Sequence, residues 1–133
     1  MHRRAVIILL CFVFFPACSP SGSLALSERN NTSSYTVKLG GRVTVTLHNT
    51  YWASPSSSES DVLAPECDAT TSSPGYGTGG CPSIPGTGCG TVTRTFIAKK
   101  AGGATITSTR KVCGEALACS PPQRFSVVVQ VVS

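Results

Sequence analysis

Three β-type runs in the last third of the chain constrain the fold more than any other feature. They span residues 91–98, 103–109 and 125–132, with a glycine turn after the first and a cysteine-containing loop after the second. Apolar and polar residues alternate within them, and the chain shows no amphipathic helical period. The sequence therefore predicts a small all-β domain that displays loops. Because such domains carry many unrelated functions, the loops must indicate the function.

Arg94 is the one charged residue on a predicted apolar face. It shares the inward side of run 91–98 with residues that favour burial. We expect it either at the rim of the domain, with its charge in water, or at a bulge that shifts the register. The remaining inward positions are regular, namely Val92, Phe96, Ala98, Ala104, Ile106, Phe125, Val127, Val129 and Val131.

Residues 35–48 predict two further strands. Residues 35–39 and 42–48 alternate between apolar and polar side chains. Gly40-Gly41 between them is a two-residue hairpin signal. Adjacent hairpins joined by a long cross-connection indicate an immunoglobulin-like antiparallel β-sandwich.

The segment after these strands predicts little regular structure. Residues 53–90 are rich in Ser, Pro and Gly, and connections of this length tend to be functional or disordered. Of the two aromatic residues just before it, we expect Trp52 in the core and Tyr51 at the surface. The alternative for both is a binding anchor, because aromatic residues dominate interface hot spots.

The N-terminus is typical of a secretory signal. A basic start, residues 1–4, precedes an apolar run of 11 residues, 5–15. That run is too short to span a membrane, which takes about 20 residues. Cys18 after Ala17 resembles the lipidated cysteine of a bacterial lipoprotein; the alternative is ordinary cleavage nearby and free secretion. We expect a signal peptide over 1–17, a polar tether over 18–34 and the domain over 35–133, in an exported protein that contacts membrane only through a lipid anchor.

The cysteines left after the signal indicate disulfides, the default in an exported protein. Short spacings favour local pairs, Cys81 with Cys89 and Cys113 with Cys119. Closing such small loops stabilises the folded state by about 2–2.5 kcal/mol. We therefore expect these bonds to fix the shape of the loops more than to hold the fold together. Cys67 is left over, and it can be free, join a dimer or replace Cys89 as the partner of Cys81.

Composition argues against several function classes. Loss of Arg3 and Arg4 with the signal leaves nine basic residues against six acidic ones, a net charge of about +3. No basic stripe of the kind that nucleic-acid binders carry is present. The sequence contains no C-x-x-C motif of the kind that binds zinc, and His48 is the single histidine after the signal. We therefore expect no cofactor, no metal and no nucleic-acid partner. A weak Ca²⁺ site is the alternative use of the loosely clustered Glu59, Asp61, Glu66 and Asp68.

An enzymatic role finds little support in the sequence. Nucleophilic catalysis needs a base beside the nucleophile. Only His48 could serve Cys67 in that way, and an exported cysteine is expected to be oxidised. We predict that the protein has no catalytic residues and is not an enzyme.

A Gly-rich loop (86–90) precedes a Thr-started strand (91–98), the turn Lys99-Lys100-Ala101-Gly102 and a further strand (103–109). This order of elements resembles the central segment of the chagasin family of cysteine-peptidase inhibitors. The segments 36–40, 43–47 and 124–127 resemble the family's first hairpin and last strand. The resemblance implies an immunoglobulin-like fold whose three end loops wedge into the active-site cleft of a papain-type peptidase.

The loops depart from the family pattern at defined places. The first lacks the family's Asn-Pro-Thr-Thr-Gly motif, the second has Cys89 where a glycine is usual, and the third has Arg110-Lys111-Val112-Cys113 in place of Arg-Pro-aromatic. We expect a chagasin-like binding module that inhibits papain-type peptidases through loops 48–52, 86–90 and 109–119. The alternative is a non-inhibitory cell-surface adhesion or assembly module whose partner is another extracellular protein. The candidate partner-binding residues are His48, Asn49, Thr50, Tyr51, Gly86, Thr87, Gly88, Gly90, Arg110, Lys111 and Glu115.

Each loop residue also has an interpretation without a partner. The glycines of 86–90 can serve only to give a tight disulfide loop its positive φ angles. Arg110 and Lys111 can be a solvated pair, and we expect Glu115 in solvent.

Overall fold

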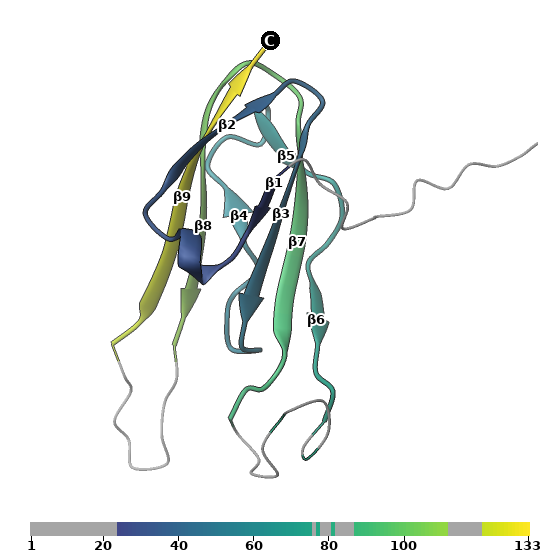
Figure 1. The fold of residues 1–133 in the computed structure, drawn as a ribbon, viewed down its shortest axis with the longest axis vertical. Helices are drawn as coiled ribbons and strands as arrows, with labels where there is room; N and C mark the ends of the chain where they lie inside the picture. Colours follow the sequence, from purple (N-terminus) through teal and green to yellow (C-terminus); the bar gives the residue numbers. More distant parts are fainter. Residues whose placement is uncertain (1–23, 76, 78–80, 82–86, 112–120) are drawn as a thin grey trace, which may run out of the picture.

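The protein folds into two β-sheets that face each other, as seen in a computed structural model (Figure 1). The structure describes residues 24–75, 77, 81, 87–111 and 121–133. A short 3₁₀ turn, η1 (Glu28–Asn30), accompanies the strands. The strands are β1 (Leu24–Leu26), β2 (Ser34–Lys38), β3 (Arg42–His48), β4 (Ser56–Ser57), β5 (Leu63–Pro65), β6 (Thr70–Ser72), β7 (Thr91–Ala98), β8 (Gly102–Arg110) and β9 (Gln123–Val132).

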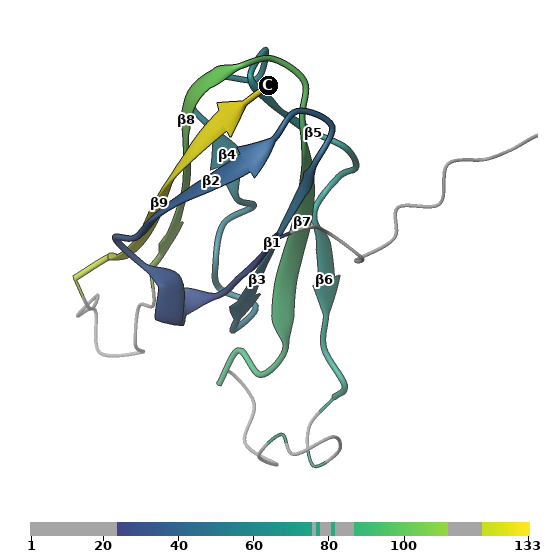
Figure 2. The ribbon, with the colours of Figure 1, turned by 45° about the horizontal axis from the view of Figure 1, so that its top comes forward.

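The two sheets have different strand orders. One contains β1, β3, β7 and β5 in that order, with β6 also paired to β7, and the other contains β2, β9, β8 and β4. Figure 2 shows these two groups as separate layers. Most neighbours are antiparallel, but β1 runs parallel to β3 and β2 runs parallel to β9. The predicted immunoglobulin-like sandwich is therefore correct, with one parallel pair in each sheet.

The core lies between the sheets and consists of the inward residues of the long strands. Alternation along β9 buries every second side chain, and the same pattern holds along β8. Burying a Val, Leu, Ile or Phe side chain in this way contributes about 1.5–3 kcal/mol. All the predicted inward residues of β7, β8 and β9 are buried, and β3 adds Val43, Val45 and Leu47.

The hairpin predicted for residues 35–48 is wrong. A turn does occur at Gly40, with φ +83°, but β2 and β3 belong to different sheets. The Leu39 N–H donates to the Val132 carbonyl of one sheet, whereas the Gly40 N–H donates to the Ala98 carbonyl of the other, both at 2.8 Å. The two glycines therefore carry the chain across the sandwich.

Two segments contain more structure than the sequence predicts. Part of the expected tether forms β1, and Leu26 there is only 3% exposed, so the sandwich already includes residue 24. Within 53–90, three short strands pair with β7 or β8. These strands are too short for an alternating pattern to stand out in the sequence.

Arg94 pairs with Val45 in an unbroken register, so no bulge occurs, and its charge is bound by the protein rather than left in water as the rim position implied. Its guanidinium donates to the Pro55 carbonyl at 2.9 Å and to the Cys67 carbonyl at 3.3 Å, and its Cζ lies 5.8 Å from the centre of the Phe96 ring. Two backbone carbonyls and the Ser54 hydroxyl thus satisfy the cation. Among the residues described, no helix is long and apolar enough to cross a membrane.

The position of β1 can be tested with two leucines. Leu26→Ala removes a side chain that is 3% exposed, whereas Leu39→Ala removes one that is 50% exposed. We expect Leu26→Ala to lower the free energy of unfolding by about 2–4 kcal/mol because it leaves a cavity, and Leu39→Ala by less than about 0.5 kcal/mol. Urea denaturation measures both; equal losses would show that residue 26 lies outside the cooperative unit.

Candidate functional site

Three predicted loops meet at one end of the sandwich, which we name the loop end. It consists of loop 48–52 after β3, the described residues 87–90 before β7, and the β8 terminus at Arg110 with Lys111. Figure 1 shows this end at the bottom, where β3 and β8 finish and β7 and β9 begin. The topology therefore brings the three predicted loop regions together rather than spreading them over both ends.

Backbone hydrogen bonds join the first two loops directly. The Asn49 N–H donates to the Gly90 carbonyl at 2.9 Å, and the Thr50 N–H donates to the Gly88 carbonyl at 2.7 Å. The Asn49 side chain adds a bond from Nδ2 to the Thr87 carbonyl at 3.0 Å. We call these three bonds the loop clasp. Two backbone hydrogen bonds and one side-chain hydrogen bond therefore hold loops 48–52 and 87–90 together as one surface.

Two glycines allow the loops to approach so closely. Gly88 has φ +68°, and a Cβ there would lie 2.4 Å from the Asn49 Oδ1 and 2.6 Å from the Tyr51 Cδ2. Gly90 has φ +140°, and a Cβ would lie 2.1 Å from the Ser72 carbonyl oxygen. The positive φ angles agree with the expectation from a tight loop. The close contacts show a second reason for glycine, which is that the neighbouring loop occupies the side-chain space.

The predicted Cys81–Cys89 disulfide is confirmed. Its Cα atoms lie 5.7 Å apart, and it closes the loop that carries Gly88. Cys67 is also disulfide-bonded, so it is neither free nor the partner of Cys81. The predicted Cys113–Cys119 pair, Gly86, Glu115 and the lipidation candidate Cys18 lie outside the described residues.

The β8 side of the loop end is formed around Trp52. Trp52 pairs with Arg110 in an isolated β-bridge, and the Arg110 Cζ lies 5.7 Å from the centre of the indole ring. Trp52 is 7% exposed and Tyr51 is 41% exposed, as predicted for a core and a surface aromatic residue. Arg110 packs on the core tryptophan and is half-buried, so it is not the freely solvated side chain that one interpretation expected, whereas Lys111 is exposed.

Glu28 is a residue of this end that sequence reasoning missed. Its carboxylate accepts hydrogen bonds from the backbone N–H of His48 and, at 2.9 Å, from the His48 Nδ1. Partial burial raises the pKa of Glu28, but the bonds from His48 and the backbone outweigh it, so the pKa lies below the ordinary value of 4.5. No local signal links two residues that are 20 positions apart. Glu28 ties η1 to the end of β3, where the first loop starts.

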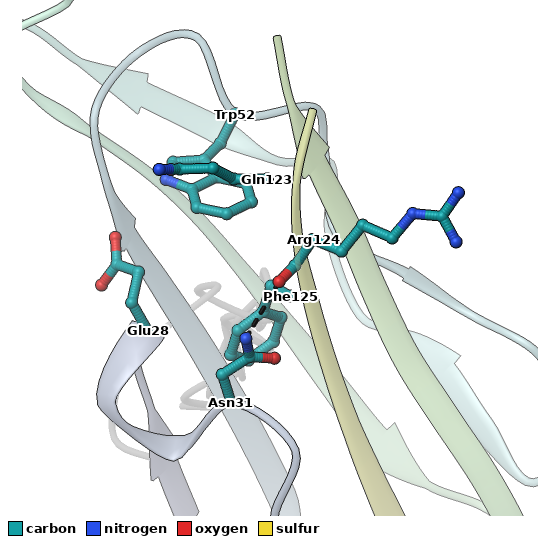
Figure 3. A pocket seen from close by; sticks show the side chains of 6 residues that line it. All are labelled: Glu28, Asn31, Trp52, Gln123, Arg124 and Phe125. Atoms are coloured by element: carbon teal, nitrogen blue, oxygen red, sulfur yellow. Dashed lines mark hydrogen bonds between the residues drawn. The ribbon is translucent and has the colours of Figure 1, made fainter. Parts of the chain in front are cut away.

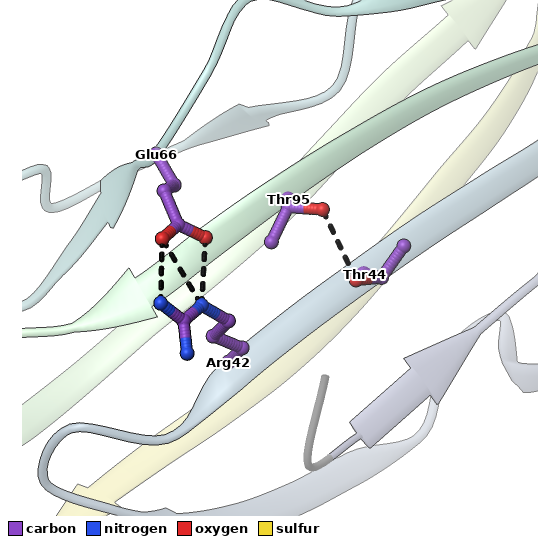
Figure 4. A network of polar contacts seen from close by, with 4 residues as sticks. All are labelled: Arg42, Thr44, Glu66 and Thr95. Atoms are coloured by element: carbon purple, nitrogen blue, oxygen red, sulfur yellow. Dashed lines mark hydrogen bonds and ion pairs between the residues drawn. The ribbon is translucent and has the colours of Figure 1, made fainter. Parts of the chain in front are cut away.

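A separate polar network lies on the outer face of the β3–β7 pair (Figure 4). The Arg42 guanidinium binds both oxygens of Glu66, at 2.9 to 3.0 Å, and lowers the pKa of that carboxyl. Thr44 and Thr95 share a buried hydrogen bond of 3.1 Å. Glu66, one of four acidic residues considered for Ca²⁺, thus already binds a cation. The described residues hold no group of three or more side chains suited to a metal.

The close approach of the loops can be tested with a glycine pair. Gly40→Ala and Gly88→Ala both place a Cβ at positive φ, but only Gly88 has atoms within 4 Å of that Cβ. We expect Gly40→Ala to cost about 1–2 kcal/mol from the left-handed conformation alone. Gly88→Ala should cost at least about 1 kcal/mol more and shift the amide resonances of Asn49 and Tyr51. Equal costs with unshifted resonances would contradict the loop clasp.

The Glu28–His48 contact predicts a pH dependence. Because the pKa of Glu28 is lower in the folded state, its stabilisation is present above the unfolded pKa and is lost as pH falls through the folded pKa. We expect Glu28→Gln to lower stability by about 0.2–1 kcal/mol at pH 6–7, as for an exposed pair, and the difference from the unmutated protein to vanish well below pH 4.5. Urea denaturation at several pH values measures it. Glu59→Gln, at an exposed position, controls for the loss of one charge.

Comparisons with known proteins find similarity in structure. No protein-family model matches the sequence, and no curated protein matches it. The chain is similar to the solution structure of amebosin, with a TM-score of 0.55, 18% identity, and coverage of 82% of this chain and 97% of that chain. It is also similar to the crystal structure of the cysteine protease inhibitor EhICP2 from Entamoeba histolytica, with a TM-score of 0.58 and 14% identity. That match covers 83% of this chain and 98% of the EhICP2 chain.

At these identities the likeness concerns the fold. EhICP2 is a cysteine protease inhibitor. The chain therefore has the predicted β-sandwich of the chagasin type, a fold that it shares with a cysteine protease inhibitor.

Proposed function

We propose that this protein is an exported inhibitor of papain-type cysteine peptidases that acts with its loop end. The observation that carries the proposal is the loop clasp, which makes loops 48–52 and 87–90 one surface, with Arg110 and Lys111 beside it. A wedge inhibitor needs its loops at one end of the scaffold. The structural similarity to EhICP2 supports the same role.

The loop end suits the occlusion of a cleft rather than chemistry on a substrate. Gly88 and Gly90 give the second loop a narrow backbone edge that can approach another chain closely. Tyr51 presents an exposed aromatic ring beside it, the type of side chain that dominates interface hot spots. Because the clasp and the Cys81–Cys89 bond hold the loops before binding, little loop entropy is lost on association.

We also propose that the chain is exported through residues 1–17 and anchored by lipid on Cys18. Support comes from the basic start and the short apolar run, which are typical of a signal. The disulfide between Cys81 and Cys89 suits an oxidising compartment outside the cytoplasm. An inhibitor tethered in this way would meet extracellular peptidases at the cell surface.

The alternative is a non-inhibitory adhesion or assembly module. The observation that favours it is the sequence of the loops themselves, because loop 48–52 lacks the Asn-Pro-Thr-Thr-Gly motif and Cys89 replaces a glycine. In that case the same loop end would bind a different extracellular protein.

Titration of the oxidised domain against papain and a cathepsin-like peptidase tests the proposal. We expect stoichiometric loss of peptidase activity at nanomolar concentrations. Tyr51→Ala should raise the inhibition constant about 10- to 100-fold, as for a hot-spot residue. The matched control is Leu39→Ala, which removes another exposed apolar side chain and lies beside Val132, where β9 ends and away from the loop end; it should change the constant less than about twofold. No inhibition at micromolar concentrations would reject the inhibitor and favour the adhesion module.

A further inference from the structure

A pocket outside the loop clasp lies between η1 and the start of β9 (Figure 3). Its volume is about 320 Å³, room for several waters or a small organic group, since a water occupies about 30 Å³. Its lining combines an apolar surface with carboxylate, carboxamide and indole groups: Glu28, Asn31, Trp52, Gln123, Arg124 and Phe125. In Figure 3 the Arg124 guanidinium points away from the pocket, so the cation takes no part in it.

The pocket contains a hydrogen-bond donor with no partner. Trp52 is 7% exposed, and its Nε1 is buried without a hydrogen bond in the part of the chain that the structure describes. In Figure 3 the indole nitrogen lies on the side of the ring that faces Glu28. A buried N–H left unpaired costs about 1–3 kcal/mol, and such groups are rare in folded proteins. An acceptor that enters this pocket would remove that cost.

The acceptor side of the pocket is Glu28. His48 fixes this carboxylate from outside the pocket, and a carboxylate has about four acceptor positions, so further positions stay open to a donor. Asn31 is held in place, because its Nδ2 donates to the Arg124 carbonyl at 3.0 Å and its Oδ1 accepts from the Ser126 N–H at 2.8 Å. Trp52 is therefore the buried donor that needs an acceptor and Glu28 the anionic acceptor that can take a donor, with the carboxamides of Gln123 and Asn31 beside them.

We propose that this pocket binds an amide group, whose carbonyl accepts from Trp52 Nε1 and whose N–H donates to the Glu28 carboxylate. A neutral group with both an acceptor and a donor fits these two side chains, and an amide carries the two on separate atoms, one for each partner. A carboxylic acid would place a second anion next to Glu28, and a guanidinium or ammonium group offers no acceptor to the indole. The amide can belong to a free carboxamide or to a polypeptide. This site does not depend on inhibition of a peptidase.

The single tryptophan of the chain allows a direct test by NMR. The intact oxidised domain gives one indole Nε1–H resonance, and it is titrated with butyramide, with 2-pentanone, which keeps the carbonyl but lacks the N–H, and with butyrate, which is anionic. We expect butyramide to shift the indole resonance saturably, with a dissociation constant on the order of millimolar. The ketone should bind more weakly, and butyrate should leave the resonance unchanged. No saturable shift with butyramide, or equal shifts with all three probes, would overturn the proposal.

Two variants locate the acceptor. Glu28→Gln replaces the anionic acceptor by a neutral one and should weaken butyramide binding about fivefold. Glu59→Gln removes an exposed carboxylate that does not line the pocket and should change binding less than about twofold. If Glu28→Gln binds as the unmutated protein does, the assignment of the donor contact is wrong. Should Glu28→Gln fail to fold, the three-probe comparison on the unmutated protein still decides.

A last probe distinguishes the two sources of the amide. N-acetylglutamine N-methylamide carries both side-chain and backbone amides. Binding at least about tenfold tighter than butyramide would support a polypeptide segment as the ligand. Binding equal to that of butyramide would support a free carboxamide.

Discussion

The structure depends on the burial of two alternating strand faces against each other. β3 and β7 supply one inner face and β8 and β9 the other, with Phe96 and Phe125 as the largest fully buried side chains. This burial is non-directional, so it fixes only that the sheets stack. The assignment of strands to the two sheets depends on the crossing at Gly40-Gly41, which places β2 in one sheet and β3 in the other. At the loop end, β3 and β8 finish and β7 and β9 begin, so both sheets carry loops there.

The loop end gains its order mainly from backbone groups. The N–H groups of Asn49 and Thr50 donate to the carbonyls of Gly90 and Gly88, respectively, and such bonds tolerate many side chains at the positions around them. What the loops cannot tolerate is a Cβ at the two glycines, where the neighbouring chain fills the space. This explains how one sandwich can present loop sequences that depart from a family pattern while it keeps their arrangement.

The site was predictable in outline and not in its contacts. Spacing within one loop identified the Cys81–Cys89 bond, and the position after a strand identified loop 48–52, because both signals are local. Glu28 gave no signal, since its partner His48 is 20 positions away. Arg110 was open to two interpretations because only its packing on Trp52 shows that its stem belongs to the core. The amide pocket likewise joins η1, Trp52 and β9, which are far apart along the chain.

The sequence by itself determined the secondary structure and the buried faces of its long strands. Three predicted runs agree with observed strands within a few residues, namely 91–98 with β7, 103–109 with β8 and 125–132 with β9. They were predictable because the two-residue period of a strand is visible in a short stretch of sequence. Only the tertiary structure decided which strands pair. It placed β2 beside β9 and β1 beside β3 in parallel, where the Gly40-Gly41 signal indicated a hairpin. The physical reason is that alternation specifies which side of a strand is apolar, whereas its partner is chosen by the burial that all strands achieve together.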